Sequence, residues 1–255
     1  MNNIKLTITF TEIFIILLNL EAFSQSKREE SFEFEKRIAP SMITLGIDNT
    51  VSKNNIHNRL FPDHNGVVEY VINPSFSGYY GFRINLLENN TYTIEVKWVD
   101  DWEIVQKRMV TEFPVKESNY RVLQTKSKQE QEEILRYNRE QYSKRFQKAV
   151  SEYTIKTMDI PISKSLADQF LETYVSLIEK HINKGVPKIS RDGYTAIFRC
   201  VVEDEVWNFS IKNPLGIFKE LTNICDKIVK DVQKEKRLND SQYVEQLEEL
   251  VKDKE

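Results

Sequence analysis

The order of apolar and polar residues in the first half of the chain follows the two-residue period of β-strands. Within 91–99, one face carries Tyr92, Ile94, Val96 and Trp98, and the other carries mainly polar residues. The run 79–87 precedes it across the short turn Glu88-Asn89-Asn90, which predicts a β-hairpin. Residues 67–72 form a third run, so we expect a β-rich domain or subdomain over residues 41–125.

The period changes to that of a helix at Ser127. Ser127 and Glu130 have the spacing of a capping box, in which each side chain bonds a free backbone amide. Apolar residues then recur at roughly helical spacing: Ile134, Leu135, Tyr142, Phe146, Val150 and Tyr153. This wide face predicts a helix that packs on another element and that Pro161 ends. The preceding stretch, 102–113, fits either a strand or a short helix.

The rest of the chain predicts a helix, a second hairpin and further helices. A helical apolar stripe covers 165–181, and strands are expected at 194–202 and 206–211. Asn213-Pro214 predicts the start of the next helix, and an amphipathic segment covers 241–252. We therefore predict an α+β protein. Antiparallel hairpins form its N-terminal half, and an α+β domain or subdomain with the order helix–helix–β-hairpin–helix and a charged tail covers 126–255.

The first 24 residues have the features of a cleavable signal peptide. Lys5 supplies the positive start, Ile13–Leu20 the apolar segment, and Ala22 and Ser24 the small residues near a cleavage site. Two alternatives remain open: a buried N-terminal element of a cytoplasmic protein, and an uncleaved membrane anchor. We expect export to the periplasm or the extracellular space, no stable membrane span after cleavage, and a solvated lead-in over residues 25–40.

Composition removes several classes of function. With 36 Lys+Arg against 39 Asp+Glu, the formal net charge is -3, and a nucleic-acid binder is expected to carry a marked basic excess instead. The three histidines, His57, His64 and His181, are scattered and lie in no metal-ligand spacing, so we predict no metal site. No phosphate-binding or nucleophile-elbow motif occurs, and we predict no cofactor.

The two cysteines allow two interpretations. Cys200 lies on a predicted strand and Cys225 on the following predicted helix, both within apolar patterns. In an exported protein they are a possible disulfide. Two buried free thiols fit the sequence equally well, because cysteine also behaves as a small hydrophobic residue.

Aromatic residues near the first hairpin are the candidates for contact with a ligand or partner: Tyr79, Tyr80, Phe82, Trp98 and Trp102. Exposed aromatic side chains stack on glycans and peptides or anchor protein interfaces. The alternative is that they fill the core of the β-rich half. Arg199, alone on an apolar strand face, is either an edge residue or the partner of a carboxylate.

These patterns favour an exported soluble protein with a binding or structural role and no recognisable catalytic motif. The start of the chain and the stretch 192–208 are similar to uncharacterised exported bacterial proteins, a resemblance that implies no active site. The partner class stays open between protein, peptide and glycan. One alternative is a hydrolase whose carboxylates converge only in the fold; adjacent acids such as Asp100-Asp101 are in turns and do not identify one. The other is a membrane-tethered protein that keeps its apolar start.

Overall fold

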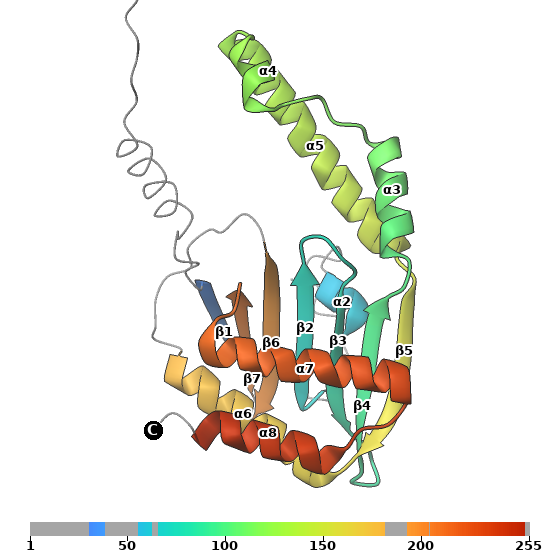
Figure 1. The fold of residues 1–255 in the computed structure, drawn as a ribbon, viewed down its shortest axis with the longest axis vertical. Helices are drawn as coiled ribbons and strands as arrows, with labels where there is room; N and C mark the ends of the chain where they lie inside the picture. The colour runs from blue at the N-terminus through green and yellow to red at the C-terminus, as the bar shows by residue number, and fades with distance from the viewer. Residues whose placement is uncertain (1–30, 39–55, 63–65, 182–192, 204, 253–255) are drawn as a thin grey trace, which may run out of the picture.

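The computed structural model describes residues 31–38, 56–62, 66–181, 193–203 and 205–252 (Figure 1). Its strands are β1 (Ser31–Ile38), β2 (Val68–Pro74), β3 (Tyr80–Leu86), β4 (Tyr92–Val99), β5 (Ile155–Ile162), β6 (Tyr194–Val202) and β7 (Glu205–Lys212). Its helices are α2 (Ile56–Leu60), α3 (Trp102–Glu112), α4 (Tyr120–Gln124), α5 (Lys128–Glu152), α6 (Lys164–His181), α7 (Gly216–Glu235) and α8 (Asp240–Lys252). The predicted α+β class is confirmed.

The strands form one antiparallel sheet in the order β1-β7-β6-β2-β3-β4-β5. β3 with β4 and β6 with β7 are the two predicted hairpins, and in the first of them Tyr80 lies opposite Trp98. β6 also pairs with β2, with Tyr70 opposite Phe198. Strands from the two halves of the sequence therefore share one sheet.

Helices α6, α7 and α8 cover one face of the sheet, and α7 crosses several strands (Figure 1). The alternation read from the sequence explains this core, because every second strand residue points towards the helices. Phe82 of β3 packs on Phe170 of α6, with ring centroids 5.4 Å apart, and Phe209 of β7 packs on Phe218 of α7 at 5.1 Å. The helices are thus held to the sheet by aromatic contacts.

The opposite face of the sheet carries a row of polar residues that register places side by side from β7 to β5. In this order the row is Asn208, Arg199, Glu69, Arg83, Glu95 and Asp159. Opposite charges meet at its centre: Arg199 Nη1 lies 2.8 Å from Glu69 Oε2, and Arg83 pairs with Glu95. Arg199 is therefore the partner of a carboxylate, one of the two expectations for it.

Residues of α2 and the loop after it cover this polar row. His57 Nε2 lies 3.1 Å from Glu69 Oε2, and both side chains are buried. Arg83 and Lys97 lie over the ring of Phe61, at 5.6 and 5.3 Å from its centroid. Because buried charges are tolerated only when they are paired, the centre of the row forms a structural layer beneath α2.

Three segments differ from the sequence prediction. Residues 31–38 of the expected lead-in form the edge strand β1, and charged side chains are common on such edges. The helix expected to reach Pro161 ends at Glu152, and Pro161 lies within β5, an edge strand that tolerates proline. Helix α7 begins at Gly216 instead of next to Asn213, whose side chain accepts a hydrogen bond from the Tyr194 amide at 3.2 Å.

Some predictions concern residues outside the described ranges. The proposed signal peptide, its alternatives and His64 fall there. Among the helices of the described ranges, none combines the length and the apolar composition needed to cross a membrane.

Candidate functional site

A helical arm, residues 102–152, is inserted between two neighbouring strands. It leaves β4 as α3, turns at α4 and returns along α5 to β5 (Figure 1). β4 and β5 are paired as far as Val99 and Ile155, so the two ends of the arm leave the sheet side by side. Figure 1 shows the arm extending away from the sheet and from the helices that cover it.

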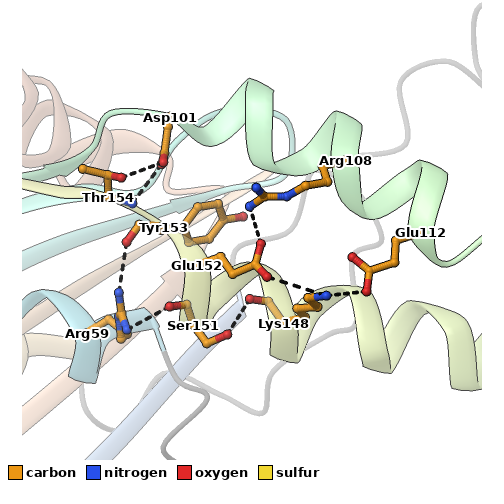
Figure 2. A network of polar contacts seen from close by, with 9 residues as sticks. All are labelled: Arg59, Asp101, Arg108, Glu112, Lys148, Ser151, Glu152, Tyr153 and Thr154. Carbon is orange, nitrogen blue, oxygen red and sulfur yellow. Dashed lines mark hydrogen bonds and ion pairs between the residues drawn. The ribbon is translucent and has the colours of Figure 1, made fainter.

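Hydrogen bonds fix the base of the arm (Figure 2). Asp101 accepts hydrogen bonds from the backbone N and the Oγ1 of Thr154, at 2.9 and 2.7 Å, and so ties the two ends together. Burial alone would raise the pKa of Asp101, but the Thr154 hydrogen bonds outweigh it and the pKa is lowered. Arg59 of α2 donates to the carbonyl oxygens of Ser151 and Tyr153, at 3.3 and 3.0 Å.

Ion pairs and a small apolar cluster join α3 to α5 just above this base. Arg108 pairs with Glu152, and Lys148 pairs with Glu112 (Figure 2). The hydrogen bond to Glu112 raises the pKa of Lys148. The apolar cluster is buried and includes residues of both helices: Val105, Met109, Ala149 and Val150. The orientation of the arm at its base is therefore set by packing as well as by polar contacts.

From the base outward, polar side chains of α5 make contacts along the length of the arm. Four of them, seven residues apart, contact Lys126, Lys116, Phe113 and Arg108 in turn: Gln131, Asn138, Arg145 and Glu152. Asn138 is buried, and Arg145 Nε donates to the Phe113 carbonyl at 2.7 Å. Since seven residues make about two helical turns, the four lie along one line of α5. Asn138 and Arg145 of this line hold the irregular segment 113–119 against the helix.

A second line of α5 is apolar and exposed. Leu135, Tyr142 and Phe146 are 45%, 54% and 46% exposed, so the part of the predicted face that they form is uncovered, whereas its other members, Ile134, Val150 and Tyr153, are buried. The described residues include ten large hydrophobic side chains that are exposed, and six of these are in the arm: Ile104, Val110, Tyr120, Leu135, Tyr142 and Phe146. Clustered exposed apolar side chains are typical of interaction surfaces.

The charge of the arm differs from that of the rest of the chain. Residues 102–152 contain 11 Lys+Arg against 8 Asp+Glu, which leaves 25 against 31 for the remaining residues. Around the apolar line, helical geometry places four cations and one carboxylate: Lys128, Arg136, Arg139, Arg145 and Glu132. The exposed apolar line is thus bordered mainly by positive charge.

The aromatic candidates from the sequence are divided between the two faces of the sheet. Phe82 is fully buried, and Tyr80 and Trp98 are half-buried cross-strand neighbours on the helix-covered face. Tyr79 and Trp102 pack in or against the apolar cluster at the base of the arm. Phe82 is therefore a core residue and offers no surface to a ligand, because alternation along β3 turns it towards α6.

Tyr80 belongs to a hydrogen-bonded group that links the sheet to α7. Asp226 accepts hydrogen bonds from Tyr80 and from Tyr70, the latter at 2.7 Å. Burial raises the pKa of Asp226, and the two hydroxyl donors offset part of that rise. The pair of donors gives this half-buried carboxylate a structural role in placing α7 on the sheet.

In this structure Cys200 and Cys225 are buried free thiols, the second of the two interpretations of the sequence. Cys225 Sγ lies 3.7 Å from the hydroxyl of Tyr174, and the two groups form a hydrogen bond inside the core. Desolvation by burial raises the pKa of Cys200 to about 12 and that of Cys225 well above its ordinary value. Neither thiol is activated as a nucleophile.

The remaining sequence candidates have structural contacts. His181 Nδ1 lies 2.8 Å from the Leu177 carbonyl, and its ring packs on Phe218. Asp100 pairs with Lys156 at 2.8 Å. Within the described ranges, no three side chains of the types that bind metals gather as a group.

Apart from Trp102 at its base, no residue of the arm was among the contact candidates of the sequence analysis. The available signals were the seven-residue spacing of Gln131, Asn138 and Arg145, and an arginine within the apolar line. Comparison with known proteins found no matching family model, no matching curated protein and no matching solved structure. The functional argument therefore depends on the arm itself.

Proposed function

We propose that this chain is an exported binding protein whose helical arm is the element that contacts a protein partner. One observation carries the proposal: six of the ten exposed large hydrophobic side chains of the described residues are on the arm. An exposed apolar side chain that touches nothing contributes little to folding, whereas the same side chain at an interface is removed from water.

The base of the arm supports the same proposal. The hydrogen bonds of Asp101 tie the two ends of the arm together, and Arg59 joins them to α2. The ion pairs of Lys148 and Glu152 join α3 to α5. A recognition element that is already ordered loses less conformational entropy on binding than a flexible one. A fixed arm is therefore suited to presenting a surface at a distance from the body of the protein.

The partner function is tested by purifying the protein under native conditions from its own compartment. The variant Leu135→Ser/Tyr142→Ser/Phe146→Ser is compared with Tyr120→Ser, a matched exposed aromatic change elsewhere on the arm. We expect a stoichiometric partner protein with the wild type and with Tyr120→Ser, and its loss with the triple variant. An identical complex with the triple variant, or a wild type without any partner, contradicts the proposal.

A thermal denaturation curve of each variant is the folding control, since exposed substitutions change stability by about 0.5 kcal/mol or less each. Export is tested separately by mass spectrometry of the mature N-terminus. Cleavage after Ser24 is the expected result, and a soluble protein that retains Met1 or Asn2 contradicts export.

A further inference from the structure

We infer that the partner of the arm is an acidic amphipathic helix, which lies along the exposed line of α5 formed by Leu135, Arg139, Tyr142 and Phe146. This inference rests on the proposed function and specifies the chemistry of the partner. It is argued from the spacing of the line, from its width and from the charges beside it.

The spacing of the line is that of a helix-pairing seam. Its four residues are separated by four, three and four positions, which is the alternation of the a and d positions of a coiled coil. Such residues insert between side chains of a second helix. Three of the four are large and apolar, and each is 45% to 54% exposed, so their surfaces are available to a partner.

The width of the line favours a helix over a lipid surface as the partner. Beside it on one flank α5 carries Glu132, Arg136 and Ser143, and on the other it carries Asn138 and Arg145. Helices that lie in a membrane interface present a broad apolar face, of the kind that surface helices use against a core. A seam of one residue per turn, closed by polar residues on both flanks, matches a single helix instead.

The charges beside the line distinguish an acidic helix from a second copy of this chain. Arg139 lies in the line itself, and Lys128, Arg136 and Arg145 lie beside it, with Glu132 as the carboxylate among them. Two such lines facing each other would bring cations together, which is unfavourable. Carboxylates at the e and g positions of a partner helix would instead meet these guanidinium groups and form ion pairs with them.

The arginines differ in how far they are already engaged. Arg145 donates through Nε to the Phe113 carbonyl at 2.7 Å, and its guanidinium carbon lies 5.4 Å from the centroid of the Tyr142 ring. Arg145 therefore has a structural task as well, and its substitution would confound a binding test. Arg139 is exposed and lies between the apolar residues, which makes it the informative position.

The test uses the full chain and two synthetic 28-residue peptides of four heptads, each with Leu at a and d. One peptide carries Glu at e and g, and the other carries Lys there. Fluorescence anisotropy of the labelled peptides gives Kd at low and at high salt. We expect the Glu peptide to bind, with an affinity that falls as salt rises, and the Lys peptide to bind about tenfold or more weakly.

Two matched pairs of variants locate the binding. Arg139→Glu is expected to weaken the Glu peptide about tenfold or more, whereas Lys144→Glu, the same charge change on the far side of α5, leaves it unchanged. Phe146→Ser is expected to weaken both peptides, and Tyr120→Ser neither. Equal effects of Arg139→Glu and Lys144→Glu, preference for the Lys peptide, or no binding of the Glu peptide would overturn the inference.

Two further measurements test the other possible partners of the line, a second copy of this chain and a lipid surface. Sedimentation that shows self-association of the wild type, abolished by Phe146→Ser, would assign the line to a second copy. Stronger binding to phosphatidylglycerol vesicles than to the Glu peptide would assign it to a lipid surface, and either result overturns the inference. If the native partner is lost with the triple serine variant but kept with Arg139→Glu, the inference fails while the proposed function stands.

Discussion

The side chain of Asn138 bonds both backbone groups of Lys116: Nδ2 donates to the carbonyl oxygen and Oδ1 accepts from the amide, each at 2.8 Å. Asn138 is buried on α5, and Lys116 lies in the irregular segment between α3 and α4. One amide side chain thereby satisfies two backbone groups that lack a helix or strand partner. This contact explains how the segment between α3 and α4 stays against α5 although few apolar residues are buried there.

Replacing Asn138 with alanine should therefore loosen the arm locally. Two backbone groups lose their partner, at a cost of about 1–3 kcal/mol. Hydrogen exchange of residues 113–126 should become faster, while the strands of the sheet keep their protection. Gln147→Ala, an exposed change on the same helix, is the control, and unchanged exchange of residues 113–126 in Asn138→Ala would contradict this role.

The buried ion pair of Arg199 and Glu69 should contribute far more to the free energy of unfolding than an exposed ion pair. Arg199→Met leaves the Glu69 carboxylate without its guanidinium partner at 2.8 Å, and breaking such a pair costs about 3–5 kcal/mol. The control Lys156→Met removes an exposed pair with Asp100 and should cost about 1 kcal/mol or less. Urea denaturation measures both free energies of unfolding.

The double variant Glu69→Gln/Arg199→Met checks the cause. With the carboxylate gone, no buried charge is left without its guanidinium partner, and stability should recover in part relative to Arg199→Met alone. A double variant that is less stable than Arg199→Met would show that the loss does not come from the charge of Glu69.

Asp226 should make stability depend on pH in a direction opposite to that of most carboxylates. Its folded-state pKa lies above the ordinary value of 3.8, because burial disfavours the charged form. The folded state therefore binds the proton more tightly than the unfolded state, and stability from this group is lost as pH rises through the folded pKa. Asp226→Asn should gain stability relative to the wild type as pH rises above 3.8.

A second variant keeps the Asp226 carboxylate and removes one of its hydrogen-bond donors. Tyr70→Phe removes a hydroxyl that donates to Asp226 at 2.7 Å and that lowers the pKa of Asp226. The pKa should rise further, and the loss of stability with increasing pH should deepen. Thermal unfolding of the three proteins across the acidic range measures the effect. Identical pH profiles for the wild type and Asp226→Asn would refute the assignment.

Both cysteines should be titratable thiols that react only after unfolding. Burial raises the pKa of Cys200 to about 12, so the reactive thiolate is scarce at neutral pH. We expect no reaction of native protein with a thiol reagent and two thiols after denaturation without reductant. A fall in Tm on adding reductant, or fewer than two thiols, would favour the disulfide instead.

Local patterns predicted much of the fold because they reflect local physics. The alternation in 91–99 and the Asn-rich turn before it placed β3 and β4, and Ser127 with Glu130 placed the start of α5, where the structure has the complete capping box. Edge strands were missed because edges carry the charges and prolines of loops: β1 contains Glu33, Glu35 and Lys36, and β5 contains Pro161.

The candidate site was harder to predict, because a local pattern does not show what covers a helix. Apolar residues at helical spacing show which side of a helix is apolar, and they do not show whether anything covers that side. For α6 that side meets the sheet, with Phe170 against Phe82, whereas for α5 Tyr142 and Phe146 stay exposed. Covering depends on contacts between segments that are distant in the sequence.

The sequence by itself determined the α+β class, both hairpins and most helix positions, since these follow from periodicity, caps and turns. Only the tertiary structure decided that β6 joins β2 in one sheet, that residues 102–152 form an arm, and that Leu135, Tyr142 and Phe146 remain exposed on it. Those features depend on long-range pairing, in which each segment competes for partners that its own sequence does not specify.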